Sequence, residues 1–240
     1  MYLIYKSCFS TPLLLQRRRR VPISATQLIG DIKSLDKVPK HLAIMFWSDD
    51  VQEERLIEVA RLCCWSLGFG VKIVSIYDAE GRLGQHVHLL QSHVNIISQK
   101  FFISEKIIPT IQITSLDSSS SSISSSTETE PDLLVNLVSR SDGRTRIVDV
   151  TKSLSEDIKQ EKLRYEDVNI RELDKRLSIS RFPEPQLLIL FSSKIFLNGF
   201  PPWHIHLTEI FHVPDNQQFC YFIFLQGLRK YSKCNQRFGK

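Results

Sequence analysis

The stretch HLAIMFWSDDVQEERLIEVARLCCWSLGFGVKIVSIYDA, residues 41–79, decides the expected fold. An apolar run opens it at 41–47, and a run rich in β-branched residues closes it at 71–79, and both have the length of a strand. Between them, capping-type residues are followed by apolar side chains at helical spacing and then by two glycines. A strand, a helix and a second strand joined by a crossover of this length predict a right-handed parallel βαβ unit.

Strand-like segments continue beyond residue 79. Apolar or β-branched runs predict four more strands, at 106–114, 132–139, 186–191 and 207–213. The run QLLILF at 186–191 is fully apolar and follows two prolines, as expected for a strand that is buried on both faces. Together these runs predict one α/β domain with a mainly parallel central sheet flanked by helices.

Helical spacing predicts two further helices, over 83–102 and 147–164, and Thr151 is the expected cap of the second. Just before it, SDGR at 141–144 predicts a turn, because Asp-Gly adopts a positive φ at low cost. The aromatic-rich segment 219–234 is ambiguous between helix and strand, and its length favours a helix.

Composition divides the chain into an arm and a domain. Residues 1–36 form the expected N-terminal arm, and residues 37–240 form the expected domain. Serine dominates 115–131, which predicts a flexible surface insertion because such a composition cannot build a packed core.

The arm carries an interrupted apolar run that is followed by four arginines at 17–20. The run falls short of the roughly 18 to 20 apolar residues of a transmembrane helix, and its charges lie on the wrong side for a secretory signal. Two interpretations stay open: a weak interfacial membrane anchor drawn to anionic headgroups, or an unstructured leader.

Charge and cysteine usage exclude some classes of function. The formal net charge is +5 and owes most to the arginine block, so nucleic-acid binding is not expected. Five cysteines and seven histidines show no metal-ligand spacing, and no metal site is expected in this chain. The odd cysteine number fits a reducing compartment, and the adjacent Cys63 and Cys64 are expected to be buried thiols.

Three separated motifs, PPWHIHLTEIFHVPD (201–215), HLAIM (41–45) and VSIYDAEG (74–81), resemble the cis-prenyltransferase (undecaprenyl diphosphate synthase) superfamily. Within it, the chain is most similar to the non-catalytic, Nogo-B receptor type subunits of dehydrodolichyl diphosphate synthase. The resemblance runs from about Lys37 to Lys240 and is interrupted by the serine insertion. It implies a cis-prenyltransferase-like fold.

Three positions depart from the catalytic members of this superfamily. Those members carry HVAIIMDGN, whose aspartate holds Mg²⁺ and the allylic diphosphate, and here Trp47 takes its place. An indole offers no oxygen to a hard cation. The family also carries a stretch close to DLLIRTGGEQRLSNF, whose arginines grip the second diphosphate, and Leu190 and Phe196 stand at those positions. The resemblance therefore implies a lost catalytic pocket, because apolar groups cannot replace guanidinium forks.

The motif at 201–215 contains four candidate interface residues, Trp203, His204, His206 and Glu209. Family resemblance places this segment at the dimer face, where aromatic anchors are favoured, whereas the residues alone also fit a partly buried strand. A lone carboxylate is weak evidence for a catalytic acid, so a structural hydrogen-bonding role is favoured for Glu209.

The chain ends in CNQRFGK, which by itself fits a frayed basic tail. Accessory subunits of this family similarly end in arginine, any residue and glycine, and the resemblance implies that this tail reaches the partner's active site. Arg237 would offer several donors to a diphosphate, and Gly239 would let a backbone N–H approach a phosphate oxygen.

The resemblance implies an accessory subunit of the enzyme that condenses isopentenyl diphosphate onto farnesyl diphosphate in dolichol synthesis for protein glycosylation. The expected partner is a catalytic cis-prenyltransferase subunit that holds Mg²⁺, and the expected location is the cytoplasmic face of the endoplasmic reticulum membrane. Alone, the chain is expected to be inactive. Two rivals remain: a non-catalytic receptor or scaffold module, and a self-sufficient homodimeric prenyltransferase.

Overall fold

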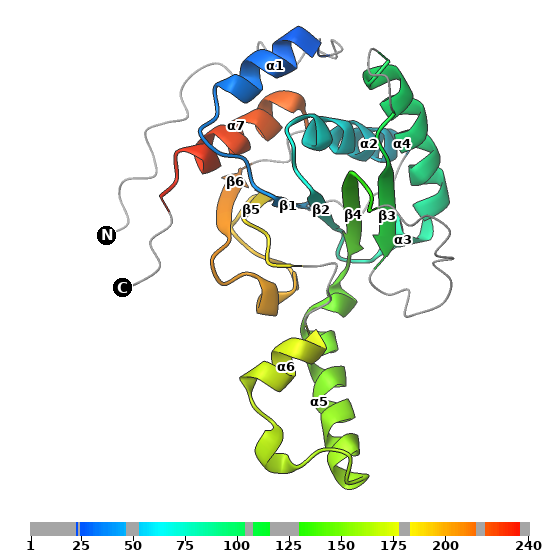
Figure 1. Ribbon diagram of the computed structural model, residues 1–240, viewed down its shortest axis with the longest axis vertical. Helices are drawn as coiled ribbons and strands as arrows, with labels where there is room; N and C mark the ends of the chain where they lie inside the picture. The colour runs from blue at the N-terminus through cyan, green and yellow to red at the C-terminus, as the bar shows by residue number, and fades with distance from the viewer. Residues whose placement is uncertain are drawn as a thin grey trace.

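A computed structural model of the chain describes residues 23, 25–46, 53–103, 108–115, 130–177, 183–214 and 219–235. Its centre is a six-stranded sheet with strand order β3-β4-β2-β1-β5-β6, and every pairing is parallel (Figure 1). The strands are β1 (His41–Met45), β2 (Ile73–Tyr77), β3 (Ile111–Ser115), β4 (Leu133–Val138), β5 (Leu187–Phe191) and β6 (Glu209–Val213). The predicted βαβ unit and parallel sheet are confirmed.

Helices connect the strands. They are α1 (Ala25–Lys33), α2 (Glu53–Gly68), α3 (Arg82–Gln85), α4 (Val87–Phe101), α5 (Arg144–Lys159), α6 (Ile170–Leu177) and α7 (Tyr221–Ser232). Short 3₁₀ turns lie at η2 (Arg140–Asp142), η3 (Tyr165–Asp167) and η4 (Pro202–His204). In the part of the chain that is described, no helix has both the length and the apolar character needed to span a bilayer.

The two faces of the sheet are covered differently. Alternate residues of a strand point to opposite faces, so Leu42 and Ile44 of β1 pack into the larger core, which includes buried side chains of α1, α2, α4 and α7. Ala43 and Met45 belong to a smaller cluster on the other face, with Phe200 from the segment after β5. Helices therefore cover one face, whereas the segment that follows β5 covers the carboxyl half of the other.

Helix α1 lies within the segment that we assigned to the N-terminal arm. Its Leu28 is 7% exposed and packs in the larger core, and burial of one leucine contributes about 2 kcal/mol. Asp31 accepts hydrogen bonds from the Tyr221 hydroxyl at 2.9 Å and from the Arg229 guanidinium at 3.0 Å. The packed body thus begins before Lys37, the first residue of the expected domain.

Two of the predicted local features are wrong. Thr151 is not a cap, because α5 already begins at Arg144 and the Thr151 hydroxyl donates to the carbonyl of Ile147 at 2.8 Å. The SDGR stretch does form the predicted turn, but without the expected positive φ, since Gly143 has φ −84° and follows the 3₁₀ turn η2.

Other boundaries differ from the sequence pattern. The predicted helix over 83–102 is divided into α3 and α4, with His86 between them. The predicted strand over 106–114 is shorter, since β3 begins at Ile111. Helix α6 was not predicted, because its eight residues contain five charged side chains and only three apolar ones. The expected helix near the C-terminus is confirmed as α7.

Helices α5 and α6 form a hairpin that projects away from the sheet, drawn in green and yellow-green (Figure 1). The hairpin has its own apolar cluster of Val150, Leu154 and Leu177, against which Ile147, Leu163, Leu173 and Trp203 pack. Because Trp203 follows β5, this cluster also ties the hairpin to the body of the domain.

His41 begins β1 and is buried, with its Nε2 atom 2.7 Å from the Ser75 hydroxyl. Burial lowers the pKa of His41 from 6.5 to about 4. The folded protein therefore holds a neutral imidazole at a pH where the unfolded chain would bind a proton.

This difference predicts a stability that depends on pH. Below pH 6.5 His41 is protonated in the unfolded state, but in the folded state it stays neutral until about pH 4. The contribution of neutral His41 to the free energy of unfolding is therefore fully present above pH 6.5 and is lost as the pH falls to about 4. We expect the free energy of unfolding in urea to be about 2 kcal/mol lower at pH 5 than at pH 7. A His41→Gln variant should lose most of this dependence, and an equal slope in both proteins would contradict the assignment.

Candidate functional site

Parallel α/β sheets bind ligands beyond the carboxyl ends of their strands, and here the part of that edge around β1 and β5 is apolar. Leu190, which the sequence resemblance assigns to a family arginine position, lies near the end of β5 and is fully buried. The side chains clustered with it are Ala43, Met45, Tyr77, Ala79, Val138, Leu188 and Phe200. None of these residues carries a charge, so this part of the edge offers nothing that binds a diphosphate.

The segment after β5 closes over this edge. The Tyr77 hydroxyl donates to the carbonyl oxygen of Asn198 at 2.5 Å, and burial raises the pKa of Tyr77 to about 12, which keeps the hydroxyl protonated as a donor. Gly199 has φ +86°, a conformation that glycine adopts without strain. Gly143 lies against it, since a Cβ on Gly143 would be 2.2 Å from the Gly199 carbonyl oxygen. These contacts fix the closing segment in place.

Phe196, which the resemblance assigns to the second arginine position, is 55% exposed and lies outside the buried cluster. Trp47, which it assigns to the position of the family aspartate, falls outside the described residues. The structure thus places Leu190 inside an apolar cluster, and it does not bring Phe196 into the same cluster.

An open depression of about 570 Å³ lies beside this edge. Its lining is Ala79, Glu80, Gly81, Gly84, Gln85, Ser115, Ser139, Arg140, Ser141 and Thr145. Arg140 supplies the one cationic side chain of this lining, and it pairs with Glu80 at 3.5 Å. One paired arginine is far fewer than the cations needed to neutralise two diphosphates.

No group of three histidine, cysteine or acidic side chains that could hold a metal ion lies among the residues of the described ranges. Cys63 and Cys64 are buried free thiols, as predicted. Burial raises the pKa of both thiols, to about 12 for Cys64, so neither forms a reactive thiolate near neutral pH.

Trp203 lies in η4 and is half-buried between the body and the hairpin. Its indole Nε1 donates to the carboxylate of Asp174 on α6 at 3.0 Å, and its ring packs against the hairpin cluster. The candidate interface residue therefore has partners within its own chain, while part of its surface stays accessible.

The neighbouring candidates lie toward the edge of the sheet. His204 is half-buried, and burial lowers its pKa. His206 is exposed, with its ring 6.4 Å from that of Trp203. Beyond it, Leu207 and Ile210 are 51% and 40% exposed at the edge strand β6. Exposed apolar residues beside an edge strand are typical of a protein interface.

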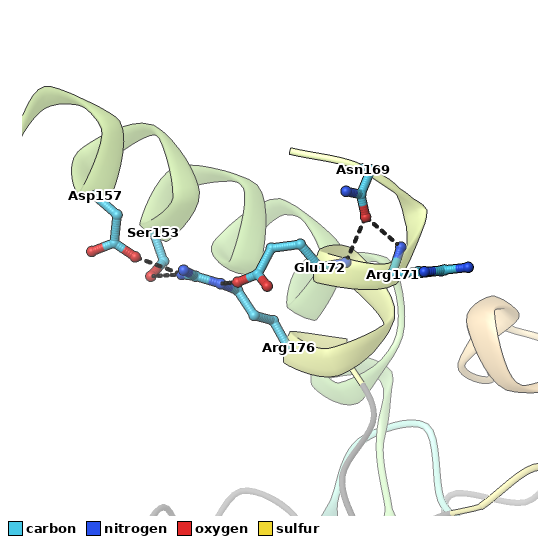
Figure 2. Close-up of polar contacts among 6 residues, drawn as sticks. All are labelled: Ser153, Asp157, Asn169, Arg171, Glu172 and Arg176. Carbon is cyan, nitrogen blue, oxygen red and sulfur yellow. Dashed lines mark hydrogen bonds and ion pairs between the residues drawn. The ribbon is translucent and has the colours of Figure 1, made fainter. Parts of the chain in front are cut away.

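The hairpin that supports Trp203 is held by one arginine (Figure 2). Arg176 on α6 donates from Nε to Glu172 at 2.7 Å and from Nη1 to Asp157 on α5 at 2.6 Å. Asn169 accepts two backbone N–H groups at the start of α6 and so caps this helix. These contacts connect a short, polar helix to its neighbour.

An Arg176→Met substitution should loosen the hairpin locally. Two carboxylates would then face each other without the cation, and the amides of α6 should exchange hydrogen several-fold faster while the sheet amides stay protected. Arg171→Met is the matched control, because Figure 2 shows its guanidinium pointing away from the network. Unchanged exchange in α6, measured by mass spectrometry, would show that Arg176 does not hold the hairpin.

Glu209 is the first residue of β6 and lies beside the end of α7. The nearby Glu209 carboxylate raises the pKa of the Cys234 thiol. The structural hydrogen-bonding role expected for Glu209 stays a prediction. The described residues end at Asn235, so Arg237 and Gly239 lie outside them, and the chain leaves the described body beside Glu209.

Some of these contacts could not be found from the sequence. The pairing of Trp203 with Asp174 depends on α6, which the sequence pattern does not predict. The close approach of Gly143 and Gly199 had a weak signal, because each glycine follows a polar residue in a turn-like stretch, but nothing in the sequence joins the two turns.

The parallel six-stranded fold is that of the prenyltransferase class. The family model described as putative undecaprenyl diphosphate synthase matches residues 85–239, and the chain belongs to this family. The structure of lavandulyl diphosphate synthase from Lavandula x intermedia in complex with dimethylallyl diphosphate superposes with a TM-score of 0.59. It covers 85% of this chain and 99% of the lavandulyl enzyme at 20% identity, which confirms the fold.

Two relatives are similar over most of the chain. One is the dehydrodolichyl diphosphate synthase complex subunit NUS1 of Saccharomyces cerevisiae, 31% identical over 88% of this chain and 62% of its own length. The other is the subunit of the same name from Schizosaccharomyces pombe, 31% identical over 87% of this chain and 80% of its own length. The chain thus spans less than two thirds of the Saccharomyces relative.

Proposed function

We propose that this chain is the accessory subunit of a dehydrodolichyl diphosphate synthase complex. In that complex a catalytic cis-prenyltransferase subunit condenses isopentenyl diphosphate onto farnesyl diphosphate for dolichol synthesis and protein glycosylation. The observation that carries the proposal is the apolar cluster around Leu190, which stands where the family's catalytic members place a diphosphate-binding arginine. Relatives named as complex subunits support the same role.

Mg²⁺ belongs to the catalytic partner in this account. The described residues of this chain do not offer a group of carboxylates for the ion, and the family's aspartate position is occupied by Trp47. This chain's own contribution would be its C-terminal residues. Arg237 would donate several hydrogen bonds to a diphosphate in the partner's site, and Gly239 would bring a backbone N–H to a phosphate oxygen. Fixed donors in a site that excludes water stabilise a departing diphosphate strongly.

Contact with the partner would use the surface around η4 and β6. Trp203, His204 and His206 lie there with Leu207 and Ile210, and Glu209 lies at the end of this surface from which the tail leaves. Apolar side chains beside polar ones suit a stable protein interface. Because the product is a membrane lipid precursor, the complex would work at the cytoplasmic face of the endoplasmic reticulum membrane.

Co-expression with the catalytic subunit from the same source tests the proposal. We expect the two chains to purify as a complex that makes long-chain polyprenyl diphosphate from farnesyl and isopentenyl diphosphates. A Leu207→Glu, Ile210→Glu double variant should lose the partner, because two charges would have to be buried at the interface. A scaffold would bind the partner but leave its activity unchanged, and that result would contradict the proposal.

A further inference from the structure

The C-terminal end of α7 is tied to the segment that leads into β1. The Ser232 hydroxyl accepts the backbone N–H of Asp36 at 2.6 Å, with the N–H of Lys37 at 3.4 Å. The Lys37 ammonium donates to the carbonyl oxygen of Cys234 at 2.5 Å and lies 4.8 Å from the centre of the Tyr231 ring. Residues almost 200 positions apart in sequence therefore meet where the tail begins.

The Lys37 contact has a local physical reason. The last carbonyls of a helix lack intrahelical donors and carry partial negative charge, so an ammonium group is favoured there. A cation beside an aromatic ring adds a further attraction. Cys234 is thus held through its backbone carbonyl by the segment that leads into β1.

Chain geometry makes this anchor relevant to the tail. Arg237 is three residues beyond Cys234, and three residues of chain span at most about 11 Å. Fixing the carbonyl of Cys234 consequently limits the volume that the Arg237 backbone can reach. A shift of about 1 Å in a group that contacts a reacting centre can lower a rate by large factors.

We propose that Lys37 is a positioning residue for the C-terminal tail: by holding the Cys234 carbonyl, it raises the fraction of complexes in which Arg237 reaches the partner's diphosphate. This inference rests on the proposed function of the tail. The core of α7 does not depend on Lys37, because Phe224 and Leu228 are fully buried, whereas the Lys37 contacts are with the C-terminal end of α7 and with Cys234 just beyond it.

The test is a double-mutant cycle in the co-purified complex, with prenyl transfer as the readout. We expect Lys37→Met to lower kcat/KM about tenfold while the complex assembles normally and its Tm stays close to that of the wild type. In the Arg237→Ala background the same substitution should have almost no further effect, because Lys37 acts through Arg237. Lys37→Arg should keep most of the activity, since it preserves the cation.

Lys233→Met is the matched control, because this exposed lysine also lies at the end of α7, and it should leave the rate unchanged. If Lys37→Met lowered activity equally in both backgrounds, or not at all, the positioning role would be overturned while the tail proposal stood. If Arg237→Ala itself had no effect, the proposed function of the tail would fail first.

Discussion

Arg237→Ala should lower prenyl transfer by the co-purified complex about 100-fold, with the two subunits still associated. The physical reason is that arginine supplies several fixed donors to a diphosphate, and the apolar cluster around Leu190 leaves this chain without a substitute for them. The effect should appear in kcat/KM for isopentenyl diphosphate. Initial rates with radiolabelled substrate, combined with size-exclusion chromatography of the complex, provide the measurement.

Lys240→Ala is the control for charge in the same tail, and it should change the rate by no more than about twofold, because the proposed function gives Lys240 no contact with the diphosphate. An Arg237→Ala complex as fast as the wild type would show that the tail does not act on the diphosphate. Loss of association in this variant would instead place Arg237 in the subunit interface.

Gly143→Ala should destabilise the fold by about 3 to 5 kcal/mol. Its new Cβ would lie 2.2 Å from the backbone carbonyl oxygen of Gly199, and neither backbone can move freely. The Tyr77 hydroxyl holds the carbonyl of Asn198. The space around Gly199 is also small, because a Cβ added there would lie 3.0 Å from Arg140 Cγ and 3.2 Å from the Tyr77 hydroxyl oxygen. The closing segment would have to separate from η2. Urea unfolding followed by circular dichroism measures the loss.

Gly30→Ala is the matched control for this substitution. Gly30 lies at an exposed position of α1, and no atom is within 4 Å of an added Cβ. Alanine there should leave the free energy of unfolding unchanged or raise it by up to about 1 kcal/mol. Equal midpoints for Gly143→Ala and the wild type would mean that the closing segment can yield, and that the carboxyl edge of the sheet is less firmly closed than the contacts indicate.

Hydrophobic periodicity was enough to predict the parallel core. The run at 186–191 became β5, and the amphipathic stretch after 47 contains α2, because burial on one or two faces leaves a direct pattern in the sequence. Hydrophobic periodicity did not predict the helices that bury few apolar side chains. Helix α6 depends on an asparagine cap and on Arg176, and α1 depends on Leu28 and on polar contacts with α7.

Some features of the candidate site were also visible in the sequence, and others were not. The apolar character of position 190 is visible in the sequence, whereas the loss of a diphosphate-binding arginine there stays a prediction from the family resemblance. The contacts of Trp203 with α6 and of Lys37 with Cys234 were not visible, because they join segments that are distant in the sequence. For Gly143 the sequence predicted a positive φ. In the structure its φ is negative, and glycine is needed there because the backbone of Gly199 approaches closely.

Under the proposed function, this chain handles no diphosphate by itself and depends on a catalytic neighbour. The decisive measurement is a prenyl-transfer assay on the purified chain with farnesyl diphosphate, isopentenyl diphosphate and Mg²⁺, beside the co-purified complex at equal concentration. We expect polyprenyl product from the complex and none above background from the chain alone. Sustained product formation by the chain alone would show that it needs no catalytic partner.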